Sequence, residues 1–263
     1  MRTVFRGLVL IGLAGGLAGM VSGCVTVQRP TIAHTHIGHT MTAWTDTPGK
    51  AGLLDTAERE ARVVTQEARA AAAASDLAAI KANVRDMRHA IDPRLQASGP
   101  GAGYGLRRAL EGSVSHVRFA MESADATPNV RSNGTRFTEI GEAVLYDVGL
   151  LIGLSDAVLG AGSASEAHAL AQEMARVAQG VQTGIDENSD GQYSAEEAGL
   201  LQMRQSMEQT LAQENPPYTT VERRWLFNLI RLPSGAWAWR DPAGGGGSGI
   251  MSREGGDGGG GGY

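Results

Sequence analysis

The hydrophobic residues between positions 75 and 93 recur at alternating steps of three and four, which is the spacing of one face of an amphipathic helix. Ser75 is suited to cap the start of this helix, and Asp92-Pro93 is suited to end it. The residues on the apolar face are Leu77, Ile80, Val84, Met87 and Ile91. They predict a helix that packs against other helices.

The same pattern predicts five more helices. The most apolar of them contains an uncharged stretch, 148–154, which we expect at the centre of a bundle. We expect this stretch to be too short, and too closely flanked by Asp147 and Asp156, to span a membrane. The five helices cover about 55–74, 106–124, 137–159, 163–185 and 194–215.

The segments between and before these helices carry turn residues. Residues 25–50, in which Pro30 and Pro48 bracket a run rich in threonine and histidine, are expected to be extended or looped, and 128–134 is expected to be a loop. The glycine-rich connector 98–105 superficially resembles a phosphate-binding loop. We exclude that function because no strand precedes the connector and no Gly-Lys-Ser/Thr closes it.

The composition supports an all-α fold. Hydrophobic residues make up 42% of the chain but aromatic residues only 5%, whereas sandwiches and barrels are richer in aromatic and β-branched residues. The expected architecture is an antiparallel helical bundle followed by an EF-hand-like helix-loop-helix and a disordered, glycine-rich C-terminal tail. The expected segments are a signal peptide 1–23, an anchor and linker 24–50, the bundle 51–162, the helix-loop-helix 163–215, an aromatic segment 216–242 and the tail 243–263.

The N-terminus has the pattern of an export signal. Arg2 and Arg6 precede a short apolar run, which ends in Val21-Ser22-Gly23-Cys24. This ending resembles the lipobox of bacterial lipoproteins, in which the cysteine thiol receives diacylglycerol and becomes the mature N-terminus. An ordinary signal peptide with a chance cysteine is the alternative. Cys24 is the only cysteine of the chain, so no intramolecular disulfide can form.

The lipobox resemblance implies a location as well as an anchor. An aspartate directly after the lipidated cysteine resembles an inner-membrane retention signal. In this chain Cys24 is followed by Val25 instead. We therefore expect an outer-membrane lipoprotein that faces the periplasm, with the inner membrane or the cell surface as alternatives. The N-terminal lipid makes the membrane the first expected partner, and an envelope protein is a second.

Residues 186–197 resemble the calcium-binding loop of an EF-hand. Acidic and amide side chains alternate before Gly191, which permits a sharp turn, and a glutamate stands at the twelfth position. The resemblance implies a calcium ion held by Asp186, Asn188, Asp190, Gln192, Ser194 and Glu197. A polar turn between two helices is the alternative, since aspartate and asparagine are common turn residues.

Three of the six histidines lie close together in the sequence, at positions 34, 36 and 39. Imidazoles are suitable ligands for copper, zinc, iron or nickel. If the N-terminal segment packs across the helices that follow, a histidine from one of those helices could complete a site. The candidate transition-metal ligands are His34, His36, His39, His89 and His116. A solvated polar linker is the alternative.

The chain has no strong signature of an enzyme. It lacks the Gly-Xaa-Ser-Xaa-Gly elbow of hydrolases and the His-Glu-Xaa-Xaa-His pair of zinc peptidases. The formal net charge of −5 argues against a nucleic-acid partner. Two functional hypotheses are favoured. The first is a lipid-anchored, non-enzymatic metal-binding or metal-handling protein. The second is a structural accessory subunit of an envelope complex, in which calcium only stiffens a hairpin. A metalloenzyme that uses the histidines is third.

Overall fold

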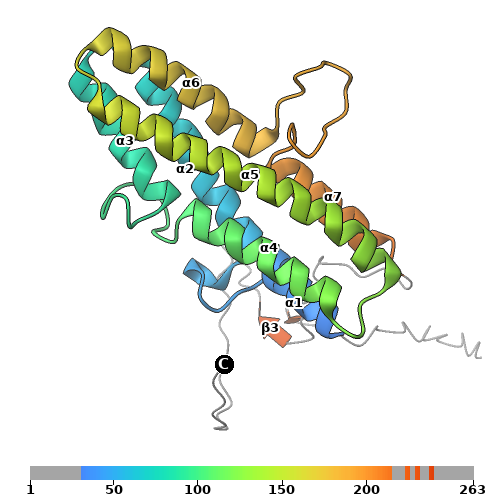
Figure 1. Ribbon diagram of the computed structural model, residues 1–263. Coiled ribbons are helices and arrows are strands. Elements are labelled where there is room, and N and C mark those ends of the chain that lie inside the picture. The colour runs from blue at the N-terminus through green and yellow to red at the C-terminus, as the bar shows by residue number, and fades with distance from the viewer. Residues whose placement is uncertain (1–30, 215–222, 226–228, 232–236, 240–263) are drawn as a thin grey trace, which may run out of the picture.

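The computed structural model describes residues 31–214 and the short segments 223–225, 229–231 and 237–239 (Figure 1). Residues 31–214 form α-helices joined by turns, and one 3-10 turn spans Pro48–Lys50. The helices are α1 (Ile32–Met41), α2 (Leu53–Ala73), α3 (Leu77–Ile91), α4 (Leu106–Glu122), α5 (Pro128–Gly160), α6 (Ala164–Thr183) and α7 (Leu200–Ala212). The all-α class expected from the sequence is confirmed for this part of the chain.

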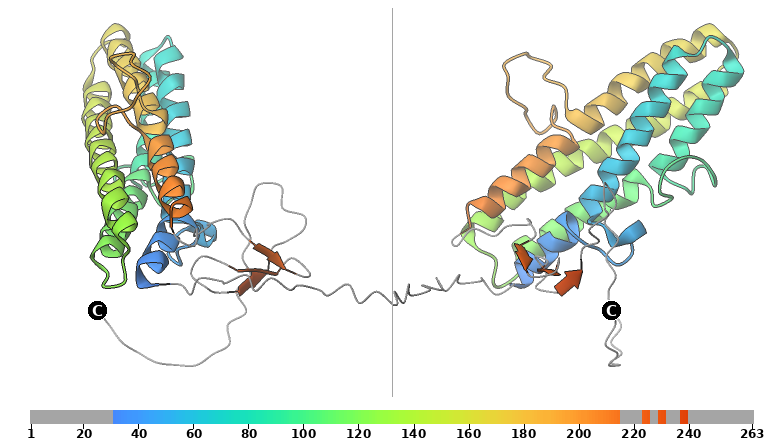
Figure 2. Two further views of the ribbon diagram at one scale, coloured as in Figure 1. Left: turned by 90° about the vertical axis from the view of Figure 1, so that its right-hand side faces the viewer. Right: turned by 180° about the vertical axis from the view of Figure 1, so that it is seen from behind.

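The helix α5 runs along the whole bundle and contacts α3, α4, α6 and α7 (Figures 1 and 2). Helices α2, α3, α5 and α6 alternate in direction and form one half of the bundle. Helix α4 packs against the N-terminal half of α5 and also contacts α1, while α7 packs against α5. The largest fully buried side chains include Phe137, Leu54, Ile80, Met87 and Leu151.

The N-terminal segment does not have the extended conformation that we expected, because residues 32–41 form helix α1. Two features stabilise this helix. The Thr31 hydroxyl caps its start by accepting the N–H of His34, and Ala33, Ile37 and Met41 form a buried stripe at helical spacing. The high content of threonine and histidine hid this stripe in the sequence.

Two further boundaries differ from our expectation. The expected loop 128–134 is the first part of α5, because Thr127 accepts the N–H of Val130 and Pro128 occupies the first turn, where its missing N–H has no cost. The last long helix begins at Leu200 rather than near Ser194. The 184–199 connection therefore stands out from the bundle as a loop (Figure 2).

By length and composition, α5 is the one helix among the described residues that is apolar enough to cross a membrane. It reaches that length because it begins at Pro128, earlier than the sequence indicated. Its buried face packs on other helices through side chains such as Phe137, Ile140 and Val148.

The segment after residue 222 contains three short strands: β1 (Arg223–Trp225), β2 (Leu229–Arg231) and β3 (Trp237–Trp239). They form an antiparallel sheet in the order β1-β2-β3, with Arg224 opposite Ile230 and Ile230 opposite Ala238. The strands add a β element that the sequence did not lead us to expect. The expected signal peptide, Cys24 and the expected glycine-rich tail lie outside the described residues.

The glycine-rich connector after α3 folds around a carboxylate of its own chain. Glu60 on α2 is fully buried, and its two oxygens accept the backbone N–H groups of Ala102, Tyr104 and Gly105 at 3.1–3.2 Å. A Cβ at Gly101 would lie 2.5 Å from Glu60 Oε2, so glycine is needed for this approach. The loop thus binds an anion, as glycine-rich loops do, but the anion is a side chain rather than a phosphate.

Candidate metal centre

Helix α1 is held in place at its N-terminus by the turn that follows α4. The carboxylate of Asp125 accepts the N–H groups of Ile32 at 2.6 Å and Ala33 at 3.1 Å. These are two of the N–H groups that a helix leaves unpaired at its start. With α1 fixed in this way, His36 and His39 lie one turn apart on the same side of the helix.

Three histidines from α1 and α4 come together in space. The candidate ligand atoms of His36, His39 and His116 all lie within 4.8 Å of one another. The Nδ1 atoms of His36 and His116 are 3.1 Å apart, so one of them donates a hydrogen bond to the other. The sequence left either His89 or His116 to complete a site with His36 and His39. The fold brings His116, 80 residues from His36 in the chain, to this position.

The environment keeps these imidazoles neutral. Burial lowers the pKa of all three, and the nearby imidazoles add to this effect for His39 and His116. The pKa of His116 falls to about 4. The neutral form carries the lone pair that binds a metal, so protons do not compete strongly for these ligands at neutral pH.

One ring nitrogen in this group is poorly satisfied by the protein. His39 Nδ1 is buried and makes no hydrogen bond within the described part of the chain. A buried polar atom without a partner carries a free-energy cost of about 1–3 kcal/mol, so such atoms are rare in native proteins. A bound metal ion, or a movement of the ring towards its two neighbours, would remove that cost.

The separations are close to those of a metal site. With metal–nitrogen bonds of ~2.0–2.1 Å, two ligand atoms on a tetrahedral ion lie ~3.4 Å apart. The His36–His116 pair, at 3.1 Å, is near that value, and an ion would replace the proton that the pair shares. Since the three ligand atoms lie within 4.8 Å of one another, the wider separations have to close by up to about 1.4 Å, a movement that side-chain torsions can supply.

Two aromatic rings, those of Trp44 and Phe119, lie beside the three histidines. The ring of Trp44 lies 4.7 Å from that of His39 and 4.6 Å from that of His116, measured between centroids. Phe119 lies 5.5 Å from His36 and 5.9 Å from His116. Sequence reasoning missed both residues. A signal existed, since Trp44 stands five positions after His39 and Phe119 three positions after His116.

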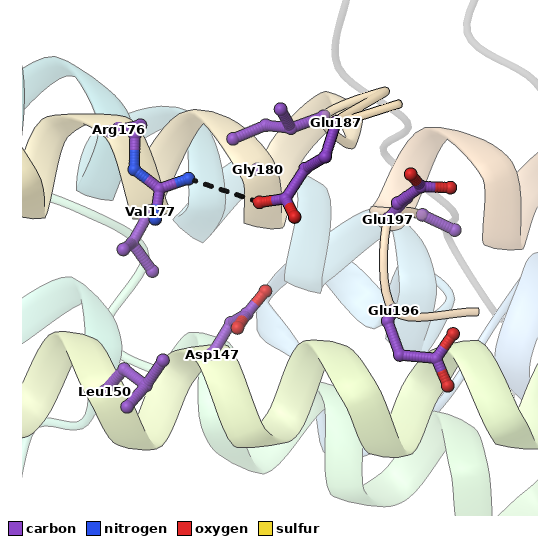
Figure 3. A pocket seen from close by; sticks show the side chains of 10 residues that line it. Asp147, Leu150, Arg176, Val177, Gly180, Glu187, Glu196 and Glu197 are labelled. Atoms are coloured by element: carbon purple, nitrogen blue, oxygen red, sulfur yellow. Dashed lines mark ion pairs between the residues drawn. The ribbon is translucent and has the colours of Figure 1, made fainter. Parts of the chain in front are cut away.

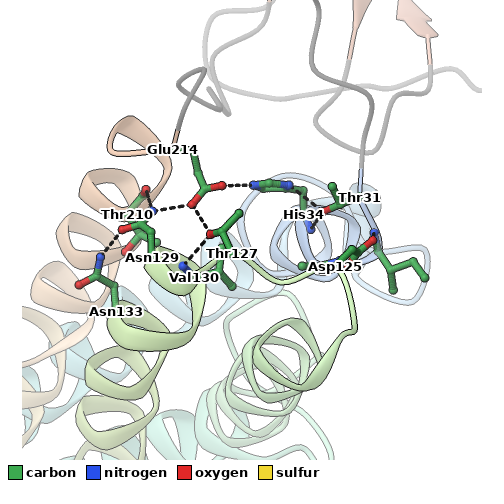
Figure 4. Close-up of polar contacts among 11 residues, drawn as sticks. Thr31, His34, Asp125, Thr127, Asn129, Val130, Asn133, Thr210 and Glu214 are labelled. Carbon is green, nitrogen blue, oxygen red and sulfur yellow. Dashed lines mark hydrogen bonds and ion pairs between the residues drawn. The ribbon is translucent and has the colours of Figure 1, made fainter.

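His34 occupies a different place from the three clustered histidines (Figure 4). Its Nε2 lies 3.3 Å from Glu214 Oε2, and its Nδ1 lies 2.8 Å from the Thr31 hydroxyl. Glu214 also accepts hydrogen bonds from the Thr127 hydroxyl and the Asn129 amide, each at 2.6 Å. This buried set joins α1, the start of α5 and the residues after α7. His34 therefore has a structural role in the fold.

His89 also lies away from the cluster. It is buried, and its Nδ1 donates to the Gln96 carbonyl at 2.8 Å, which fixes the turn after α3. Gly99 covers His89 from the connector, because a Cβ on this glycine would come within 2.7 Å of His89 Cβ.

In the first half of the loop 186–197, side-chain oxygens accept backbone N–H groups of the same loop. The carboxylate of Asp186 accepts the N–H groups of Asp190 and Gly191, and the Asn188 side chain accepts the N–H of Asp190. Gly191 has a positive φ of 78°, which glycine adopts without strain. These bonds coil the chain about Asp186.

The second half of the loop differs from the implied arrangement. The Glu197 carboxylate accepts the N–H of Ser194 at 3.0 Å, and this bond is the main reason that its pKa lies below the usual range. Within the described residues, the side chains close enough to hold an ion are the three histidines, not the acidic groups of this loop. Calcium binding at Asp186, Asn188, Asp190, Gln192, Ser194 and Glu197 therefore stays a prediction.

A pocket lies at the base of this loop, between α5 and α6 (Figure 3). Arg176 forms an ion pair with Glu187 at 3.7 Å on one side of it. Burial raises the pKa of the Asp147 carboxyl, and the charge of Glu187 adds to the rise while that of Arg176 opposes it. Four of the ten lining residues are acidic and one is basic; the full lining consists of Asp147, Leu150, Arg176, Val177, Gly180, Ile185, Glu187, Glu196, Glu197 and Ala198.

Comparison with known proteins yields no relative. No protein-family model matches the chain. No curated protein and no solved structure matches it either.

Proposed function

We propose that this protein is a lipid-anchored, non-enzymatic helical protein of the cell envelope that binds a transition-metal ion through His36, His39 and His116. One observation carries the proposal: three imidazoles from two helices converge, and their lowered pKa values keep them neutral. Copper, zinc, iron and nickel all accept such nitrogen ligands. The alternative, a structural accessory subunit, needs no metal at these residues.

The proposed anchor would keep this centre close to a membrane. Thr31 follows Cys24 by seven residues, a length of chain that spans at most ~25 Å. Lipid on Cys24, with acyl chains in the outer membrane, would therefore restrict the site to the layer of periplasm next to that membrane. The proposed role is to hold or pass on a metal ion there, in contact with an envelope partner.

The metal is tested directly by elemental analysis of the full chain purified without a histidine tag. The proposal expects about one transition-metal ion per molecule after the protein is loaded and desalted. A protein that retains no such ion after loading, while circular dichroism shows its helices intact, would favour the structural-subunit alternative.

The anchor gives a second prediction. Replacing Cys24 by serine removes the thiol that the diacylglycerol would modify, so the variant should stay unlipidated and retain its signal peptide. Mass spectrometry of the mature N-terminus measures both. An N-terminus that begins at another residue in the parent protein, without lipid, would overturn the anchor.

Calcium at the 186–197 loop is a second candidate activity, favoured by the turn that coils the chain about Asp186 and by the positive φ of Gly191. Calcium takes 6–8 oxygen ligands, and a bidentate glutamate at position twelve is part of such sites. Binding would require Glu197 to exchange its N–H partners for the ion. The ion would then neutralise part of the negative charge of the loop.

The calcium prediction is tested by thermal unfolding. Calcium in a hundredfold excess over Kd should stabilise the fold by ~2.7 kcal/mol, and Glu197→Gln should remove most of that effect. Glu196→Gln is the matched control, because it removes the same charge from the neighbouring residue. Magnesium should substitute poorly, since it requires tight octahedral geometry. If calcium does not change the Tm of the parent, and calorimetry shows no heat of calcium binding, the loop is only a turn.

A further inference from the structure

The surroundings of His36, His39 and His116 distinguish between the metals that imidazole can bind. Among the described residues, no carboxylate belongs to this group. Asp125, whose charge acts on His36, accepts the N–H groups at the start of α1, and Asp46, two positions after Trp44, pairs with Arg108. An ion at this site therefore has neutral ligands and no anionic ligand.

The charge of the ion decides how costly such a site is. The free-energy cost of removing an ion from water rises with the square of its charge, so a divalent ion loses about four times as much hydration as a monovalent ion of the same size. Anionic ligands normally compensate a divalent ion for this loss. A half-buried, neutral, ring-lined site lacks that compensation, which favours a monovalent ion.

The position of Trp44 points in the same direction. Its indole ring lies next to the imidazoles of His39 and His116, with centroid separations of 4.7 Å and 4.6 Å. An aromatic π system in that position attracts a cation.

We propose that the site takes monovalent copper, Cu(I), held by the three imidazoles and covered by the indole of Trp44 as a non-coordinating cation–π contact. This inference rests on the proposed function and deepens it. Cu(I) is a filled-shell ion that accepts three nitrogen ligands without a fourth. Zn(II) in a three-histidine site keeps a water as its fourth ligand, and that water would separate it from the indole.

The experiment compares the two ions on the full chain under anaerobic conditions. Cu(I) is titrated against a chromophoric Cu(I) chelator and Zn(II) against a chromophoric zinc chelator, with tryptophan emission recorded in both. We expect one Cu(I) per chain, bound more tightly than Zn(II), with quenching of emission that Trp44→Phe removes. The other tryptophans, Trp225, Trp237 and Trp239, remain in that variant as an internal reference.

Two variants separate the role of the ring from its packing. Trp44→Leu should weaken Cu(I) binding by ~10-fold and leave Zn(II) binding nearly unchanged, whereas Trp44→Phe, which keeps a ring, should retain most of the Cu(I) affinity. The Cu(I) proposal is overturned if Zn(II) binds more tightly than Cu(I), or if Trp44→Leu lowers the affinity for both ions equally. Either result leaves the proposed metal-binding function in place. Failure of both ions to bind a folded protein would overturn the two proposals together.

Discussion

Replacing His116 by alanine should abolish high-affinity metal binding. Three ligands share a total binding free energy on the order of 10 kcal/mol, so the loss of one removes ~3 kcal/mol, which is ~100-fold in Kd. His36→Ala and His39→Ala should have effects of the same size, because all three atoms lie within 4.8 Å of one another. Competition titration of each variant with the metal that the parent binds measures the loss.

The matched control for this series is His168→Ala. His168 is a single histidine on α6, remote in sequence from α1 and α4, and its removal should leave the metal affinity unchanged. Far-UV circular dichroism should show that the helices persist in all variants, since the three clustered histidines are only half-buried. A triple variant, His36→Ala with His39→Ala and His116→Ala, that still binds the metal as tightly as the parent would show that the ion is held elsewhere.

Replacing Glu60 by alanine should cause a large loss of stability without touching the metal centre. The carboxylate of Glu60 accepts three backbone N–H groups, from Ala102, Tyr104 and Gly105, and it is fully buried. In Glu60→Ala these donors lose their acceptor in the protein interior. Each such donor costs about 1–3 kcal/mol, so we expect the free energy of unfolding to fall by ~3–5 kcal/mol.

Glu60→Gln should have an intermediate effect. The amide oxygen can still accept from part of the loop, but its NH₂ group would face an N–H donor. Chemical denaturation followed by circular dichroism measures both variants, with Glu122→Ala on the exposed surface of α4 as the control. The expectation is wrong if the free energy of unfolding of Glu60→Ala lies within ~1 kcal/mol of the parent value. Water would then replace the carboxylate as acceptor for the buried N–H groups without a cost.

The periodicity of apolar residues was sufficient to predict most of the helices. The stripe from Ile80 to Ile91 became the buried face of α3. The predicted cap was wrong by one residue, since Asp76 rather than Ser75 caps this helix by accepting the N–H of Ala79. These features depend on residues three or four positions apart, which interact in any helix regardless of the rest of the fold. The all-α class followed from the same local information.

Boundaries and partners could not be predicted in the same way. Helix α1 has a weak apolar pattern, and it owes its position to Asp125, which lies 93 residues from Ile32 in the chain. The start of α7 was displaced because Gly199, not Ser194, is its N-cap residue; Gly199 packs closely against the end of α6, where a Cβ would come within 2.4 Å of the Gly180 carbonyl oxygen. Such tertiary contacts set where these two helices begin and lie, and they override the local helix propensity.

The candidate metal centre shows the same division. The sequence alone identified the histidine-rich segment and the residue types that bind metals. Only the tertiary structure placed His36 and His39 next to His116. It also showed that His34 contacts Glu214 and that His89 bonds to the turn after α3. Adjacent positions on a helix point in different directions, so His34 and His36 separate once the segment is helical rather than extended. The choice of partner on α4 then follows from how the two helices pack, which no local pattern records.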